Sequence, residues 1–262
     1  MLKFSLLQST PTLTIAVIIF ILIIIFYLLG YYLRRRANIK NPEKSKADLG
    51  ALNGTLLGLL ALLLAFTFGM SNSRFDTRRQ LIVEEANDIG TVILRTDMYP
   101  DSVRQLLRAN LKEYVEARIA FGQVGMNQEK IVEYYLKADS IGKEVWSVTA
   151  SYAKVDNITT RTSELVPALN AMIDITTTRR AAGEATIPDS IMYFLFILCF
   201  CSAFLLGYDS KGKIDWIVLM GLAVMLSSTV FTIIDLDRPR SGLINMDRPT
   251  QKIIELREMF EQ

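Results

Sequence analysis

Residues 12–33 read TLTIAVIIFILIIIFYLLGYYL and contain no charged side chain. A helix needs about 20 mainly apolar residues to cross the hydrocarbon layer of a bilayer, and this stretch meets that length. Three further stretches share its character, at residues 49–70, 191–208 and 214–234. The sequence therefore predicts four transmembrane helices in two pairs, and we interpret the first as a retained anchor rather than a cleaved signal peptide.

The segment between the two pairs is polar and amphipathic. Val103, Leu107, Leu111 and Tyr114 recur at helical spacing there, and no strand-like alternation persists. We therefore expect an all-α, multi-pass membrane protein with a helical extramembrane bundle. The expected division is a first transmembrane pair at 1–70, the helical domain at 71–187, a second transmembrane pair at 188–236 and a C-terminal tail at 237–262.

Composition argues against several classes of function. The net charge is only +2, so no basic field points to nucleic acid. The chain has no histidine, which removes the commonest general base and metal ligand. Its two cysteines, Cys199 and Cys201, both lie inside an apolar run. We therefore expect no catalytic residues, no cofactor and no metal, and we do not expect an enzyme.

Small residues recur along one side of the second span. Residues at i and i+4 on a membrane helix share a face, and small ones there let two helices approach closely. The stripe consists of Gly50, Gly54, Gly58, Ala61 and Ala65. It predicts tight helix packing, either within the chain or between chains.

A second stripe on the same span has polar groups at its ends and leucines between them. Its members are Asn53, Leu57, Leu60, Leu64, Thr67 and Ser71. If this span lines a central pathway, the polar residues would line its two hydrated ends and the leucines would form an apolar constriction between them. The alternative is that the leucines face lipid and the polar residues lie at the two interfaces.

The fourth span ends in charged residues. Asp235, Asp237 and Arg238 come where a charge must find water, a cation or a partner. They are candidates for a charged element at a pathway mouth, and a salt-bridged helix end is the simpler interpretation. Spacing beyond the second span also suggests helix-face ion pairs, Asp76 with Arg79 and Arg78 with Glu85.

Five short stretches together resemble one family. They are LLAFTF at 63–68, SRFDTRR at 73–79, EANDIG at 85–90, TIP at 186–188 and DLDRPRSG at 235–242. Over residues 47–244 the chain resembles the bacterial bestrophin-like membrane proteins, which are distantly similar to the true bestrophins.

The resemblance implies a function. True bestrophins are pentameric ion channels, mostly anion-selective, with four membrane segments and a helical cytosolic domain. The resemblance therefore implies a homo-oligomer in a bacterial plasma membrane, surrounded by lipid, and a pentamer by analogy with the true bestrophins. This oligomer would pass small inorganic ions, with anions as the expected class. Residues 235–242 depart from the related bestrophin element at Arg240, where an aromatic residue is expected. No long acidic run follows them, which argues against calcium gating.

Two questions stay open at this point. The same small-residue stripe and helical domain would suit a non-conducting structural or signalling membrane protein. Orientation is also open, because two indications disagree. Basic residues in the short loops favour a cytoplasmic location for those loops, whereas the bestrophin layout puts the helical domain in the cytosol. The loop residues are Arg34, Arg35, Arg36, Lys40, Lys44, Lys46, Lys211 and Lys213.

Overall fold

The computed structural model describes residues 10–40, 50–156, 158–210, 214–238, 240, 242–244 and 246–261, with the side chains of 38–40 left aside. Lys44, Lys46, Lys211 and Lys213, which bear on orientation, lie outside the described residues.

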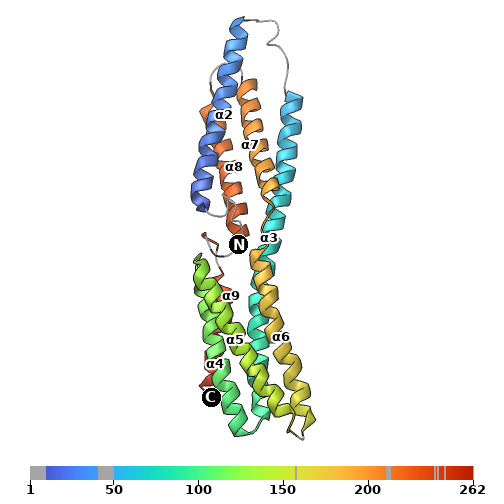
Figure 1. Ribbon diagram of the computed structural model, residues 1–262. Coiled ribbons are helices and arrows are strands. Elements are labelled where there is room, and N and C mark those ends of the chain that lie inside the picture. The colour runs from blue at the N-terminus through green and yellow to red at the C-terminus, as the bar shows by residue number, and fades with distance from the viewer. Residues whose placement is uncertain are drawn as a thin grey trace. The chain divides into compact units, whose positions relative to one another are not determined.

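All regular structure in the described part of the chain is helical (Figure 1). The helices are α2 (Thr12–Lys40), α3 (Gly50–Arg95), α4 (Asp101–Gln123), α5 (Gln128–Ala153), α6 (Thr159–Glu184), α7 (Asp189–Asp209), α8 (Trp216–Asp237) and α9 (Asp247–Glu255), with 3-10 turns η2 (Thr96–Met98) and η3 (Leu256–Phe260). The all-α fold class is confirmed. The second span is the start of a helix of 46 residues, because no Pro interrupts α3 and its apolar pattern continues beyond the span.

The chain divides into two compact units. The first consists of Met1–Ser73 and Thr186–Arg238, and holds α2, the first part of α3, α7 and α8. In this unit α2 packs along α7 and α8. Its core is made of fully buried apolar side chains from these helices, among them Ile23, Leu195, Cys199, Ala223 and Val230.

Two glycines set the distance between α2 and α7. A Cβ atom on Gly30 would meet Phe204 O, and would lie 2.8 Å from Tyr208 N. A Cβ atom on Gly207 would likewise meet the backbone of Tyr27. These two helices therefore pack backbone to backbone, as small residues permit where lipid gives no hydrophobic drive for association.

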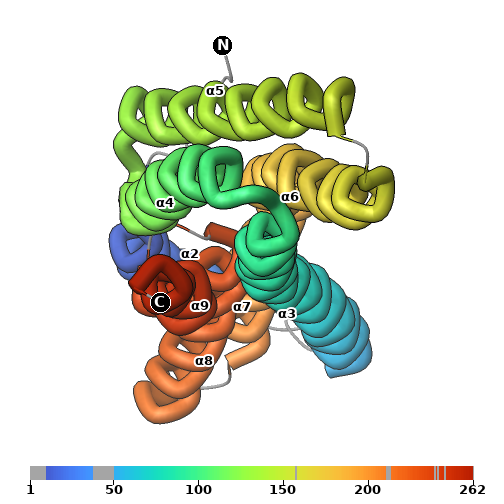
Figure 2. Tube along the Cα trace, turned by 90° about the horizontal axis from the view of Figure 1, so that it is seen from below, coloured from blue at the N-terminus to red at the C-terminus, as the bar shows by residue number. Residues whose placement is uncertain are grey.

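The second unit consists of Arg74–Ala185 and Pro239–Gln262. Here α5 lies along α4 and α6, and α9 packs on α4 (Figure 2). The apolar faces expected from the sequence meet in its core, where Leu107, Leu111 and Tyr114 of α4 are at most 1% exposed. The segment that holds α9 and η3 belongs to this unit, because Ile253 of α9 is fully buried in the same core.

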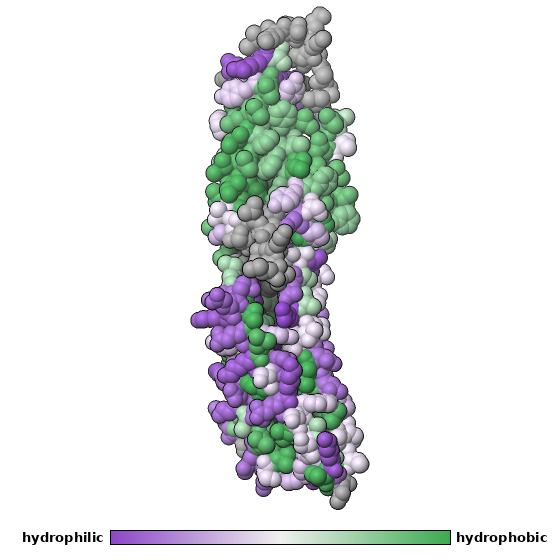
Figure 3. Space-filling view, viewed as in Figure 1, coloured by the Kyte–Doolittle hydropathy of each residue, from purple (hydrophilic) through white to green (hydrophobic). Residues whose placement is uncertain are grey.

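Four of the described helical stretches are long and apolar enough to cross a membrane. The apolar windows lie in α2, the start of α3, α7 and α8, and the first charged residue of α3 is Arg74. Over these spans the surface is dominated by hydrophobic residues, whereas polar and apolar residues mix over the second unit (Figure 3).

Candidate functional site

The polar and leucine stripe of α3 faces the protomer's own helices. Asn53, Leu60, Thr67 and Ser71 are at most 7% exposed, and Leu57 and Leu64 are half-buried. Ser71 Oγ donates to Ile233 O of α8 at 3.0 Å, and Thr67 Oγ1 donates within its own helix to Leu63 O at 2.8 Å. Within one protomer the polar groups of this stripe therefore find partners inside the first unit, and a pathway along these residues stays a prediction.

The small-residue stripe is the outward side of α3. Gly50, Gly54, Gly58, Ala61 and Ala65 are all exposed in the protomer. A Cβ atom on Gly54 or Gly58 would meet nothing within 4 Å. The expected tight packing is thus absent from the described residues of one chain at these positions. The glycines that do carry a close approach, Gly30 and Gly207, were not singled out from the sequence.

Large apolar side chains accompany that outward stripe. Leu59 is 46% exposed, Leu62 53% and Phe66 63%. Together with the small residues they give α3 a face that is apolar throughout and has no intrachain partner among the residues described. We call this set, Gly54, Gly58, Leu59, Ala61, Leu62, Ala65 and Phe66, the outer face of α3.

A polar cluster ties three spans together at one end of the first unit. Arg34 of α2 donates to Tyr208 O at 3.1 Å and lies 3.6 Å from a carboxylate oxygen of Asp209 at the end of α7. Asn53 of α3 donates to the other oxygen of Asp209 at 3.1 Å. These groups fix α2, α3 and α7 relative to one another, because charged and polar donors hold a carboxylate strongly.

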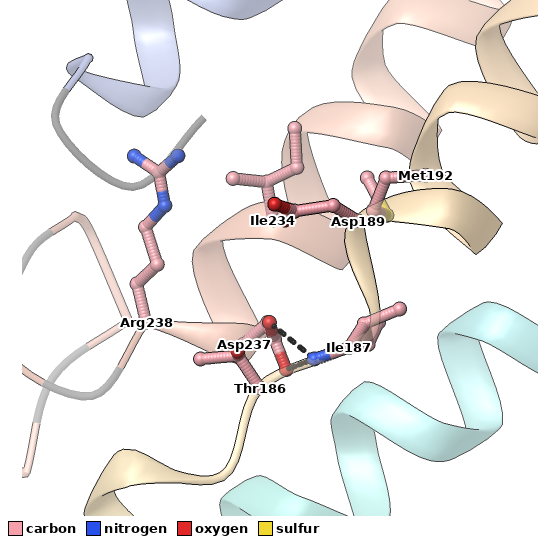
Figure 4. Close-up of a pocket in the computed structure, with 7 residues that line it drawn as sticks. All are labelled: Thr186, Ile187, Asp189, Met192, Ile234, Asp237 and Arg238. Carbon is pink, nitrogen blue, oxygen red and sulfur yellow. Dashed lines mark hydrogen bonds between the residues drawn. The ribbon is translucent and has the colours of Figure 1, made fainter. Parts of the chain in front are cut away.

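The charged residues at the end of α8 lie beside a small pocket. Its lining is Thr186, Ile187, Asp189, Met192, Ile234, Asp237 and Arg238. Asp237 accepts a hydrogen bond from the backbone N–H of Ile187 at 3.0 and 3.2 Å to its two oxygens, just before α7 begins (Figure 4).

The other two charged residues at this end differ in their surroundings. Arg238 extends away from Asp237 in Figure 4 and donates to Thr10 O at 2.5 Å. Asp235 is fully buried within α8. The structure thus brings Asp237 and Arg238 to one pocket, where they hold the start of α7 and the residues before α2.

The charged residues after the second span split into two groups. The pair of Asp76 with Arg79 is present at 3.5 Å, as its spacing predicts. Glu85 instead accepts from Arg118 Nε and Arg179 Nη1. Arg78 donates to Ala182 O at 3.0 Å and to Ala185 O at 2.5 Å, so it satisfies carbonyls at the end of α6.

No group of three or more His, Cys, Asp or Glu side chains that could hold a metal ion occurs among the described residues. The pocket of Asp237 presents two carboxylates, Asp237 bound to a backbone donor and Asp189 in the first turn of α7, and an arginine aimed elsewhere. The arrangement can anchor helix ends and present charge, and it shows no pairing of a nucleophile with a base.

The comparisons with known proteins agree with this architecture. A family model described as a bestrophin-like domain matches residues 21–248. A crystal structure of a mutated bacterial bestrophin homologue from Klebsiella pneumoniae matches with a TM-score of 0.73 at 13% identity, over 97% of this chain and 100% of that chain. A second crystal structure of a bestrophin homologue from that organism gives 0.69 at 14% identity, over 94% and 98%. No curated protein matches. At such identities the structural likeness shows the fold alone.

Proposed function

This membrane protein belongs to the bestrophin-like family, and on that premise we propose that it forms a homo-oligomeric ion channel, conducting anions, in the bacterial plasma membrane. The family and the fold supply the first support. The division into a transmembrane pair, a helical domain, a second transmembrane pair and a tail is part of the proposal. So is the absence of catalysis.

The outer face of α3 is the observation that carries the proposal. A helix packed on one side by its own protomer and apolar with small residues on the other is suited to meet other copies of itself. Symmetric closure of such a contact places equivalent faces around one axis. We therefore propose that the outer face, with Leu59, Leu62 and Phe66 as its large side chains, lines the pathway as an apolar constriction.

The inward stripe then has a supporting role. We propose that Asn53, Leu60, Thr67 and Ser71 hold α3 against its protomer and so fix where the outer face lies. Asp235, Asp237 and Arg238 remain the proposed charged element at a mouth of the pathway. The contacts of Asp237 with the residues before α7, and of Arg238 with those before α2, support a role in which the mouth and the helix ends move together.

Subunit counting followed by flux measurement tests the proposal. The protein is purified in mild detergent, its oligomeric mass is measured, and it is reconstituted into liposomes loaded with chloride or with potassium. A closed oligomer with chloride flux well above that of empty liposomes is the expected result. A monomer, or an oligomer that passes neither ion, contradicts it.

A non-conducting structural or signalling role is the second candidate. It is favoured by Val132 and Leu136 of α5, which lie one helical turn apart and are 49% and 56% exposed in the extramembrane domain. Exposed apolar pairs of this kind suit partner docking. Stable oligomers that pass no ion, together with specific retention of a partner that is lost in Leu136→Asp, would favour this role over conduction.

A further inference from the structure

Three arginines surround one aromatic ring in the second unit. The guanidinium carbons of Arg118, Arg179 and Arg240 lie 4.6, 5.4 and 4.6 Å from the ring centroid of Phe121. They come from α4, from α6 and from the segment after α8, and Phe121 itself is 5% exposed. The fold therefore gathers three positive charges from distant parts of the chain at the end of α4.

Glu85 is the carboxylate that pairs with this cluster among the described residues. It is fully buried and accepts from Arg118 Nε and Arg179 Nη1. Within the residues that the structure describes, Arg240 donates to neutral groups, Phe121 O at 3.0 Å and Val124 O at 2.7 Å. Three guanidinium groups and one carboxylate leave the cluster with a positive charge that no carboxylate in the described part of the chain balances.

The cluster also contains hydrogen-bond donors that have no acceptor among the described residues. The side chain of Arg118 is 1% exposed, yet Nη1 and Nη2 make no hydrogen bond to any residue that the structure describes. Burial, and then the like charges of Arg179 and Arg118, lower the pKa of Arg240 to about 10. Unsatisfied buried donors and uncompensated buried charge are both costly, so the cluster is stabilised by any anion that supplies acceptors there.

We propose that this arginine cluster is a binding site for a small oxyanion of the phosphate or carboxylate class. The guanidinium fork matches two oxygens of such an anion, which a spherical halide cannot offer. Arg240 is partly exposed and the Arg179 side chain is 10% exposed, whereas Arg118 and Glu85 are at most 1% exposed, so the anion would enter from the side of Arg240. This site lies outside the spans and does not depend on whether the protein conducts.

Binding of inorganic phosphate to the full-length protein in detergent tests the inference directly. Equilibrium binding of radiolabelled phosphate is expected to saturate at about one phosphate per chain, and Tm to rise by about 5 °C at a hundredfold excess over Kd. Sodium chloride at matched ionic strength is expected to produce no saturable rise. Absence of saturable phosphate binding, or an equal rise with chloride, would overturn the proposal.

Two matched variants locate the site. Arg240→Gln removes one positive charge from the cluster and is expected to weaken phosphate binding at least tenfold. Arg257→Gln removes one from an exposed pair with Glu116 elsewhere in the same unit and is expected to bind as the wild type does. Equal weakening in both variants would show an effect of overall charge, and unchanged binding in Arg240→Gln would place phosphate elsewhere. Either result would overturn the assignment.

Discussion

Gly207 of α7 lies directly against the backbone of Tyr27 in α2, so close that a Cβ atom on Gly207 would sit 3.0 Å from Tyr27 Cα and closer still to the Tyr27 carbonyl. Neither backbone can move aside cheaply, because α2 is packed along both α7 and α8. This contact and its counterpart at Gly30 set the close packing of α2 against α7 in the first unit.

Gly207→Ala is therefore expected to destabilise the protein, although alanine favours a helix over glycine by about 1 kcal/mol. We expect an overpacking cost of about 1–3 kcal/mol. Thermal unfolding of the detergent-purified protein measures it. Gly58→Ala is the matched control, since a Cβ atom there meets nothing within 4 Å. Equal Tm values for the two variants would contradict the backbone contact.

Phe66→Ser is expected to raise ion flux. If the outer face of α3 lines an apolar constriction, a small polar side chain there makes the constriction easier to wet. We expect an increase of roughly tenfold, which corresponds to about 1.4 kcal/mol off the barrier. Chloride efflux from liposomes at equal protein density gives the measurement.

Val224→Ser is the control for that experiment. Val224 lies in α8 and is 52% exposed, so it also loses apolar surface in the bilayer. Its flux is expected to match that of the wild type. An equal rise in both variants would indicate general membrane leak rather than a pathway along α3.

The sequence predicts the two stripes of α3 but not the environment of either one. Apolar windows were sufficient to find the four spans, and helical spacing found the buried face of α4. Both stripes of α3 were also found. The sequence does not decide which of the two stripes packs against the other helices of the same protomer. In a membrane an apolar helix face can pack equally well against a helix of its own chain, against lipid or against a neighbouring subunit. Ser71 reveals the answer only through its hydrogen bond to Ile233, which is 162 residues away.

Glu85 illustrates the same limit for charges. Spacing along one helix suggested Arg78 as its partner, since only neighbours on a shared face can be seen in a sequence. Its partners Arg118 and Arg179 are 33 and 94 residues away and come from other helices. The nearby pair of Asp76 and Arg79 was predictable because both residues belong to one helical turn.

Asp237→Ala is expected to change both stability and flux. The carboxylate accepts the N–H of Ile187 before α7 begins, and losing a hydrogen bond to a charged group costs about 1.5–3 kcal/mol. We expect a lower Tm together with altered flux per oligomer, because the start of α7 and the proposed mouth share this residue.

Asp215→Ala separates those two effects. Asp215 accepts from the N–H groups of Ile217 and Val218 at the start of α8, and losing such a cap costs about 0.5–2 kcal/mol. Its Tm is expected to fall while flux per oligomer is unchanged. Altered flux in both variants, in proportion to Tm, would reduce the role of Asp237 to helix anchoring.

Glu85→Gln is expected to be among the most damaging single changes in the second unit. Removing one partner of a buried ion pair leaves its neighbours uncompensated, at a cost of about 3–5 kcal/mol. Here two guanidinium groups lose their shared carboxylate. Burial lowers the pKa of Arg118 but the charge of Glu85 outweighs it, so the net shift is upward and reports this dependence.

The matched control is Glu116→Gln, which breaks an exposed pair with Arg257 and is expected to cost under about 1 kcal/mol. The hydrogen bond from Arg257 holds the pKa of Glu116 below its ordinary value. Its small contribution is therefore present above that ordinary value and is lost as pH falls through the lowered one. Chemical unfolding of both variants at neutral pH, followed by far-UV circular dichroism, provides the comparison. Similar losses in the two would mean that the buried carboxylate stabilises the unit no more than a surface pair does.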